Sequence, residues 1–395
     1  MTTQQDLAAP ARQAPAEPGK LFDITPSDEQ RLLTKAVRDF AINELRPAAA
    51  DADVERTTPA ALLEGAAELE IAAIGVPEAL GGVYAERAAV SAVLVAEALA
   101  EGDLGIAVGL LAPAAVATTI GLFGDASQQS AYLPGFLAAQ PTVGAVAIQE
   151  PHALFNALSL RTKAVKSGSG YILNGAKALV PRAAAGELFI IGAELEGRPA
   201  LFIVESSAPG VTVEDDPAMG LRPAATGRLL LKDVKVGAEA LIGAATEGDA
   251  EGSDLQSSES AYRQVIALGR IGWAALATGT GEAVLKYVKE YVNDRVAFGE
   301  PISHRQSVAF MAANIAIELD GLRLSTYRAA SLAETGKPFA REAALARQLT
   351  TRYGMQIGTD GVQLLGGHGF VKGHPVERWY RDLRAAGIME GALVI

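Results

Sequence analysis

The middle of the chain sets the strongest limit on its fold. Between about residues 143 and 243, short β-rich runs such as VGAVAI, LFIIGAE, ALFIVE and GRLLLKDVKV alternate with turn clusters. No helix of useful length interrupts them, and parallel strands normally need a helical crossover. The region therefore predicts a compact antiparallel β domain, with a hairpin turn at the SGSG of residues 167–170.

Helical patterns flank this region on both sides. Before it, Thr25 and Pro26 predict the start of a first helix. After it, long segments at about 258–295, 304–335 and 338–365 predict a bundle. The predicted fold class is α+β, mostly α. It has a disordered lead-in (1–22), an N-terminal helical domain (23–141), a central antiparallel β domain (142–244), a mobile linker (245–258) and a C-terminal four-helix bundle (259–395).

Composition narrows the class of protein. The 395 residues include no cysteine, which excludes disulfides and thiolate metal sites and fits a reducing cytoplasm. The net charge of −12 argues against nucleic acid as a partner. The four histidines lack metal-ligand spacing, so no metal site is predicted. The N-terminus lacks the apolar core of a signal peptide. An uncharged stretch from Leu104 to Gly124 is interrupted by Pro113, which predicts a broken pair of buried helices rather than a membrane span.

One carboxylate near the end of the chain has an unusual setting. Glu390 stands between Ile388-Met389 and Gly391-Ala392. Apolar neighbours and a glycine hinge suit a base held at the edge of a pocket, because a carboxylate is a stronger base in apolar surroundings. The alternative is a solvated charge on a frayed tail.

Three stretches in the last third suit an extended cofactor with a diphosphate. They are DRVAFGEPISHRQ (294–306), DGVQLLGGHGF (360–370) and PVERWYRDLRAAGIMEG (375–391). Taken singly, each is compatible with an ordinary surface or helix end. Together they make a coherent set. The planar guanidinium of Arg295 suits a diphosphate, Phe298 can pack against a ring system, and Gln363 can form a hydrogen bond. Gly366 and Gly367 have no side chains, so the diphosphate of a cofactor could approach the backbone closely there.

The order of these motifs resembles the acyl-CoA dehydrogenase family, and the resemblance extends over nearly the whole chain, including GVPEALGG. It implies FAD as cofactor and an acyl-CoA thioester as substrate. Family members are commonly tetramers in which one subunit holds the diphosphate and adenine of a neighbour's FAD. The resemblance therefore implies a homotetramer or homodimer, or a hetero-oligomer with a related subunit.

The resemblance also assigns residues to roles. Glu390 falls on the family's catalytic carboxylate, and Arg270, Gly391 and Phe155 fall near the substrate. The cofactor contacts that it implies are Arg295, Phe298, Gln306, Gln363, Gly366 and Gly367 on the diphosphate side, and Ile148, Gln149 and Val180 beside the flavin ring.

Around the flavin ring the chain departs from the family pattern. His152, Leu154 and Phe155 replace small residues, Leu179 stands for a tryptophan and Pro181 for a threonine. The leading hypothesis is an acyl-CoA dehydrogenase that passes electrons to an electron-transfer flavoprotein. Three alternatives stay open: a half-site or non-catalytic subunit of a heteromeric enzyme, a non-redox acyl-CoA-binding protein, and an oxidase.

Overall fold

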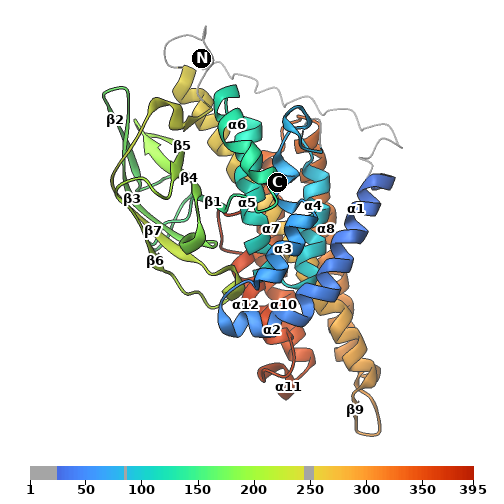
Figure 1. Ribbon diagram of the computed structural model, residues 1–395. Helices are drawn as coiled ribbons and strands as arrows, with labels where there is room; N and C mark the ends of the chain where they lie inside the picture. Colours follow the sequence, from blue (N-terminus) through green and yellow to red (C-terminus); the bar gives the residue numbers. More distant parts are fainter. Residues whose placement is uncertain (1–24, 84–86, 244–252) are drawn as a thin grey trace, which may run out of the picture.

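The computed structural model describes residues 25–83, 87–243 and 253–395, and Figure 1 shows a body of helices with a sheet along one side. The order of helices, sheet and helices confirms the predicted fold class. The predicted lead-in and residues 245–252 of the predicted linker lie outside the described residues. Residues 253–258 are instead the first turns of helix α7 (Ser253–Asp294), and Ser258 already lies buried there, so the predicted linker is too long.

The first helix begins at Ser27 rather than at Thr25. The Ser27 hydroxyl accepts a hydrogen bond from the Gln30 N–H (3.1 Å), and the Gln30 side-chain oxygen accepts one from the Ser27 N–H (3.0 Å). This reciprocal capping box satisfies two donors at the helix end, so the predicted start is wrong by two residues. The elements of this part are α1 (Asp28–Phe40), the π turn η1 (Ala41–Leu45), α2 (Arg46–Glu55), α3 (Ala60–Glu68), the 3₁₀ turns η2 (Ile71–Gly75) and η3 (Glu78–Leu80), α4 (Ala89–Gly102), α5 (Leu104–Phe123), α6 (Ala126–Tyr132) and the 3₁₀ turn η4 (Leu133–Leu137).

Helix α5 runs unbroken through Pro113, so the predicted broken pair of helices is wrong. A proline inside a helix removes one hydrogen bond. Burial outweighs that loss here, because every residue from Leu104 to Ile120 is buried. Among the described helices, α5 is long and apolar enough to cross a bilayer, but 83% of its apolar window lies inside the fold. It is therefore a core helix.

The middle of the chain forms a sheet with the strand order β6-β7-β3-β2-β4-β5-β8, and β1 pairs with β4 beside this path. Most neighbours are antiparallel, and the predicted hairpin joins β2 to β3 through a two-residue turn. The strands are β1 (Gly144–Ala147), β2 (Lys163–Ser167), β3 (Gly170–Val180), β4 (Leu188–Leu195), β5 (Arg198–Glu205), β6 (Val211–Asp215), β7 (Gly227–Val236) and β8 (Leu241–Ile242), with 3₁₀ turns η5 (Ala183–Ala185), η6 (Arg222–Ala224) and η7 (Ala238–Ala240).

The sheet is not wholly antiparallel, because β4 pairs in parallel with both β1 and β2. Parallel neighbours need a crossover. For β1 and β4, the β2–β3 hairpin and its loops provide that crossover in place of a helix. The sequence pattern shows strands and turns but not which strands become neighbours, so the prediction is wrong at these two pairs.

The sheet has two buried faces, and one of them meets the helices. In β4, Phe189 and Ile191 pack in the sheet's own core, while Leu188 and Ile190 belong to the large core shared with the helices. This alternation is the period-two pattern of a strand buried on both sides. Helix α7 packs on β5 and also on α4, α8 and α9, so it is the central rod of the molecule.

Four helical rods form the C-terminal part, as predicted: α7, α8, the run α9–η9–α10, and α12. The elements after α7 are β9 (Val296–Ala297), β10 (Glu300–Pro301), the 3₁₀ turn η8 (Ile302–His304), α8 (Gln306–Glu334), α9 (Ala340–Leu349), the π turn η9 (Thr350–Gly354), α10 (Met355–Leu364), α11 (Gly367–Phe370) and α12 (Val376–Ala386). In Figure 1, α11 and β9 lie at the lower end of the bundle, away from the C-terminus.

Candidate active site

Glu390 lies in the turn that follows α12, and its side chain is 13% exposed. The Arg270 guanidinium on α7 donates to both carboxylate oxygens, from Nη2 to Oε1 at 2.8 Å and from Nε to Oε1 and Oε2 at 3.1 and 3.2 Å. Arg347 on α9 approaches to 3.9 Å. A bidentate arginine fixes the direction of a carboxylate as well as its charge. Glu390 is therefore a largely buried carboxylate with a fixed orientation, rather than a solvated charge on a frayed tail.

The turn that carries Glu390 is held on both sides. Gly391 has a φ of +74°, and a Cβ there would lie 2.7 Å from Ile148 Cγ1. The Gly391 carbonyl accepts a hydrogen bond from the Trp273 indole (2.9 Å), and the Ala392 N–H donates to the Val146 carbonyl (2.8 Å). A glycine is thus required for backbone shape and close packing. The sequence predicted a hinge at this position, whereas the structure has a firmly bonded turn.

The residues assigned to the flavin ring lie beside this turn. The Gln149 side-chain oxygen accepts the Glu390 backbone N–H (3.1 Å), and its carbonyl accepts the Ala178 N–H (2.9 Å). Ile148 and Val180 are buried. Phe155 is partly buried and meets His152 edge-on, with ring centroids 5.7 Å apart. The structure therefore brings Ile148 and Gln149 to the base, while Phe155 packs against His152 of its own loop and against the large core.

A buried ion pair supports this end of the site. Lys177 on β3 is fully buried and donates to Glu150 (2.9 Å) and to the Ile148 carbonyl (3.1 Å). Burial lowers the pKa of Lys177 to about 8. Although burial opposes it, the charge of Lys177 together with the backbone N–H groups of Thr162 and Arg161 lowers the pKa of Glu150 to about 2. The pair therefore ties β3 to the segment that presents Gln149.

The residues assigned to the diphosphate lie at the other end of the bundle, on exposed surface. Arg295 follows α7, and Phe298 is 94% exposed with a φ of +56° in the two-residue turn between β9 and β10. Gln306 starts α8, and Gln363 lies in the last turn of α10; both are exposed. In the described part of the chain, the Arg295 side chain makes no hydrogen bond or ion pair. The Arg305 guanidinium lies 5.5 Å from the centroid of the Phe298 ring, so this exposed aromatic side chain makes a cation–π contact.

A groove of about 360 Å³ links two of these motifs, because Arg295 and His368 both line it. The Tyr291 hydroxyl contacts His368 Nδ1 at 2.6 Å, and the Tyr287 hydroxyl contacts His374 Nδ1 at 2.6 Å. Gly366, next to this groove, has a φ of +56°, and a Cβ on Gly366 or Gly367 would meet nothing within 4 Å. The sequence predicted the arginine and the glycines but not the tyrosines, whose spacing is that of any helix face.

A second, basic groove of about 600 Å³ lies along the N-terminal half of α7. It is lined by four cations, Arg87, Arg198, Arg263 and Lys337, and by one carboxylate, Glu259. Glu259 accepts from Arg198 (2.9 Å) and Arg263 (2.7 Å). The groove ends at Ala267, one helical turn before Arg270. This groove has no signal in the sequence, because its cations come from four separate segments with no shared motif.

The fold consists of a helical domain, a β domain and a second helical domain, and these surround a largely buried, oriented carboxylate. This is the arrangement of an acyl-thioester dehydrogenase, an oxidoreductase that acts on a CH–CH bond. Models of the acyl-CoA dehydrogenase family match in sequence: the N-terminal domain at residues 27–140, the middle domain at 145–234 and the C-terminal domain at 260–395. An acyl-CoA dehydrogenase of Bacillus subtilis (strain 168) is 34% identical over 372 residues, which cover 92% of this chain and 95% of that protein.

The short-chain specific acyl-CoA dehydrogenase of Megasphaera elsdenii is 32% identical over 379 residues, which cover 94% of this chain and 96% of that protein. The solved structure of butyryl-CoA dehydrogenase from Megasphaera elsdenii has a TM-score of 0.82 at 30% identity, covering 93% of this chain and 95% of that one. The chain belongs to the acyl-CoA dehydrogenase family. Members of this family are FAD-dependent, as the resemblance in sequence implied.

The residues present fit this cofactor at both ends. A free guanidinium at Arg295 and open backbone at Gly366 and Gly367 suit a diphosphate. Buried apolar side chains at Ile148 and Val180 suit one face of a ring system, and the Gln149 amide supplies a hydrogen-bonding group beside it. At the departures from the family pattern, the Leu179 N–H donates to Asp216 (3.0 Å) and Pro181 is buried.

Proposed function

We propose that this chain is an FAD-dependent dehydrogenase that forms an α,β double bond in an acyl-CoA thioester, with Glu390 as the base. The observation that supports it best is the Glu390 carboxylate, 13% exposed and oriented by the Arg270 fork. A base must lie within hydrogen-bond reach of the proton that it removes, in a fixed orientation. An oriented carboxylate in a tightly bonded turn meets that requirement better than any other acid near the site.

The groups around Glu390 have separate roles in this reaction. The carboxylate takes the proton from the carbon next to the thioester, while Arg270 and Arg347 keep it in place. The Glu390 backbone N–H, which donates to Gln149 in the structure, is the donor for the thioester oxygen as negative charge develops there. Gln149 yields this donor by rotating its side chain. FAD, when bound, accepts the hydride from the β-carbon.

The basic groove suits the phosphates of coenzyme A. From Arg270 back to Gln256, α7 rises about 20 Å at 1.5 Å per residue. Gln256, Arg263 and Ala267 line the groove along that length. A thioester whose phosphates lie far from its reactive carbon needs a path of this kind. Loss of the Arg263 charge should raise KM for acyl-CoA and leave kcat nearly unchanged.

We propose further that two copies of the chain complete each FAD site. The residues for the diphosphate lie at the exposed end of the bundle, whereas Glu390 and Gln149 lie in its middle. Helix α8 also carries an exposed apolar stripe at seven-residue spacing, Phe310 (63% exposed), Ile317 (69%) and Leu324 (48%). Such spacing is typical of a helix that packs on another helix.

A charge on this stripe tests self-association. Ile317→Glu should lower the mass of the assembly in sedimentation velocity and release FAD. Val165→Glu is the matched control, because Val165 is 62% exposed on β2, outside the stripe. An unchanged mass for Ile317→Glu would contradict the proposed interface.

The visible spectrum of the purified chain tests the proposed reaction. We expect a yellow protein that an acyl-CoA bleaches without oxygen, and slow reoxidation by oxygen until an electron-transfer flavoprotein is added. A colourless chain that gains flavin only with a related subunit would indicate a half-site. Flavin that never bleaches would indicate non-redox acyl chemistry, and fast reoxidation with release of peroxide would indicate an oxidase.

A further inference from the structure

A cavity of about 260 Å³, distinct from the two grooves, lies between the first helices and the sheet, away from Glu390. Leu110 and Pro113 of α5 face it, whereas Leu111 and Ala114 face the buried segment that follows Glu390. The cavity is therefore on another side of α5 from the base. Its remaining walls are α3, η2 and the segment from Ala139 to Val143.

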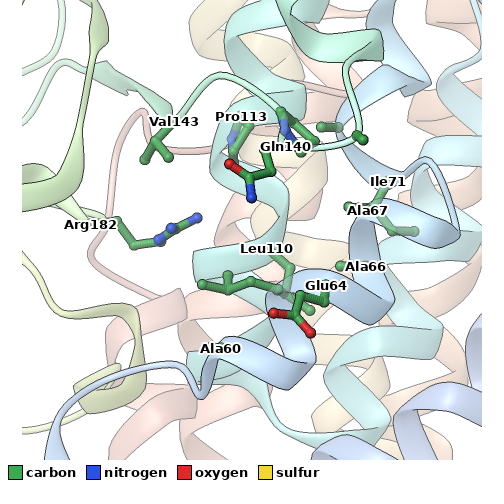
Figure 2. Close-up of a pocket in the computed structure, with 14 residues that line it drawn as sticks. Ala60, Glu64, Ala66, Ala67, Ile71, Leu110, Pro113, Gln140, Val143 and Arg182 are labelled. Atoms are coloured by element: carbon green, nitrogen blue, oxygen red, sulfur yellow. The ribbon is translucent and has the colours of Figure 1, made fainter.

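The cavity is apolar with one cation in its wall. Alanines and the side chains of Leu63, Ile71 and Leu110 form most of the lining. Figure 2 shows Arg182 reaching in from the sheet side, with Gln140 above it and Glu64 across from it on α3. Glu64 and Gln140 are exposed at the rim, while Arg182 is half-buried.

Among the residues that the structure describes, no side chain pairs with the Arg182 guanidinium. Its neighbours in the β domain are paired: Arg228 donates to Asp216 (3.0 Å), and Arg222 lies 3.5 Å from Asp53. In the part of the chain that the structure describes, the Arg182 guanidinium makes no hydrogen bond or ion pair. Burial lowers its pKa below the ordinary arginine value. A half-buried guanidinium has lost part of its hydration, so an anion that enters the cavity can pair with it.

The backbone holds this arginine in an unusual conformation. Arg182 has a φ of +48°, in the left-handed region that favours glycine. Its N–H donates to the Ala224 carbonyl (2.8 Å), and its carbonyl accepts the Ala185 N–H (3.0 Å). Strain of this kind persists where the surroundings over-determine it, and it gathers at binding sites. The turn fixes the stem of Arg182, which passes Gly109 of α5 on its way into the cavity.

We propose that this cavity binds a small free carboxylic acid, with its carboxylate on Arg182 and its apolar body against α3 and α5. The planar guanidinium pairs with a carboxylate through two parallel hydrogen bonds. Glu64 at the rim and the apolar walls disfavour a doubly charged phosphate. A 150 Å³ cavity holds benzene, so this one holds about ten non-hydrogen atoms, the size of octanoate.

The test uses the full chain and octanoate labelled with ¹³C at carbon 1, followed by the NMR shift of its carboxylate. We expect saturable binding that weakens by about 10- to 100-fold in Arg182→Met, the loss of a charged hydrogen-bonded partner. Arg161→Met, which removes an exposed arginine of the same domain, should leave the affinity unchanged. Octanol labelled at carbon 1 should bind at least about tenfold more weakly than octanoate.

A second variant separates loss of the site from loss of the fold. Ala67→Leu fills the cavity from α3 without touching Arg182 and should weaken octanoate binding as well. Circular dichroism and thermal unfolding show whether each variant folds. If Arg182→Met or Ala67→Leu does not fold, octanoate binding by the other variant tests the proposal. Absence of saturable binding overturns the proposal, as does an affinity that neither variant changes, or octanol binding as tightly as octanoate.

Discussion

The two ends of the proposed FAD site differ in how they are held. At the base end, the Glu390 carboxylate accepts hydrogen bonds from Arg270, and the Glu390 N–H donates to Gln149. The next carbonyl in the turn, that of Gly391, accepts a hydrogen bond from Trp273. At the diphosphate end, Arg295 has no partner in the described residues and Phe298 is 94% exposed. The sequence of the base end follows the family pattern less closely than that of the diphosphate end. Within one chain, however, the side chains and backbone of the base end are the ones that already have their hydrogen-bond partners.

This difference shows what a motif does and does not specify. In the proposed arrangement, the arginine, glutamine and glycines of the diphosphate end contact the ligand and another copy directly, so their identities matter. At the base end, backbone groups and a buried ion pair do much of the positioning, so side chains such as Leu179 can change. The match to the family motifs is therefore greatest at the diphosphate end, where the side chains of a single chain have the fewest partners.

The largest expected effect comes from a substitution that removes the base and leaves the diphosphate end intact. Glu390→Gln keeps the shape of the side chain but removes its capacity to accept a proton. Stopped-flow flavin reduction by acyl-CoA should slow by about 10²- to 10⁴-fold, the range for loss of a general base, with FAD still bound. Glu214→Gln, an exposed carboxylate on β6, should change nothing. Equal reduction rates in Glu390→Gln and the native chain would remove Glu390 from the reaction.

A second change tests whether the buried pair holds the base end. Lys177→Met leaves Glu150 without its buried counter-charge and should lower the free energy of unfolding by about 3–5 kcal/mol. Lys163→Met removes the partly exposed pair with Glu194 on the same sheet and should cost less than about 1 kcal/mol. Urea unfolding measures both. Similar losses would mean that the buried pair has no special part.

At the diphosphate end, we expect a binding effect without a chemical one. Arg295→Ala should raise the dissociation constant of FAD by about 10- to 100-fold, through loss of charge-assisted hydrogen bonds. The reduction rate at saturating FAD should stay near that of the native chain. Arg341→Ala, an arginine with 79% side-chain exposure on α9, is the control. FAD affinity that Arg295→Ala leaves intact would contradict the assignment of this end.

The last comparison concerns α12, which runs between the two ends. Asp382 is fully buried and its Oδ1 accepts the Leu221 N–H (2.7 Å). Burial, and then the nearby Asp103 carboxyl, raise its pKa to about 8, against the opposing pull of Arg378 and Arg381. The folded chain therefore keeps a proton that the unfolded chain releases, so stability falls as pH rises from about 4 to 8.

Asp382→Asn removes this proton and keeps the acceptor for Leu221. The free energy of unfolding of the variant should fall less steeply between pH 5 and 8, by up to about 1.4 kcal/mol per pH unit. Asp233→Asn, in an exposed part of β7, should leave the slope unchanged. Parallel pH profiles of Asp382→Asn and the native chain would show that Asp382 is ionised throughout.

Periodicity and motif order were sufficient for the fold class, because buried faces of helices and strands repeat at fixed spacing. They were insufficient where a choice depended on neighbours in space. The unbroken α5 at Pro113 and the parallel pairing of β4 depend on such contacts. The capping box of Ser27 with Gln30 is a local S-x-x-Q pattern, so the start of the first helix could have been predicted correctly.

The site divides in the same way. The resemblance assigned Glu390 as the base and placed Arg270 near the substrate, and the two form an ion pair at 2.8 Å. The second guanidinium, Arg347, and the basic groove come from segments that carry no motif. The cavity beside Arg182 was equally invisible, since an unpaired arginine cannot be told from a paired one in a sequence.

Activity of mixed variants tests most directly the claim that one copy supplies the base end and another the diphosphate end. Glu390→Gln lacks the base, and Arg295→Glu places a negative charge where the diphosphate of FAD should bind, so each is expected to be inactive. When the two are unfolded together and reassembled with FAD, hybrid assemblies should regain about a quarter of native activity, because half of the pairs are mixed and one of their two sites is intact. A mixture no more active than its separate components would contradict the account and place both ends of the site in a single chain.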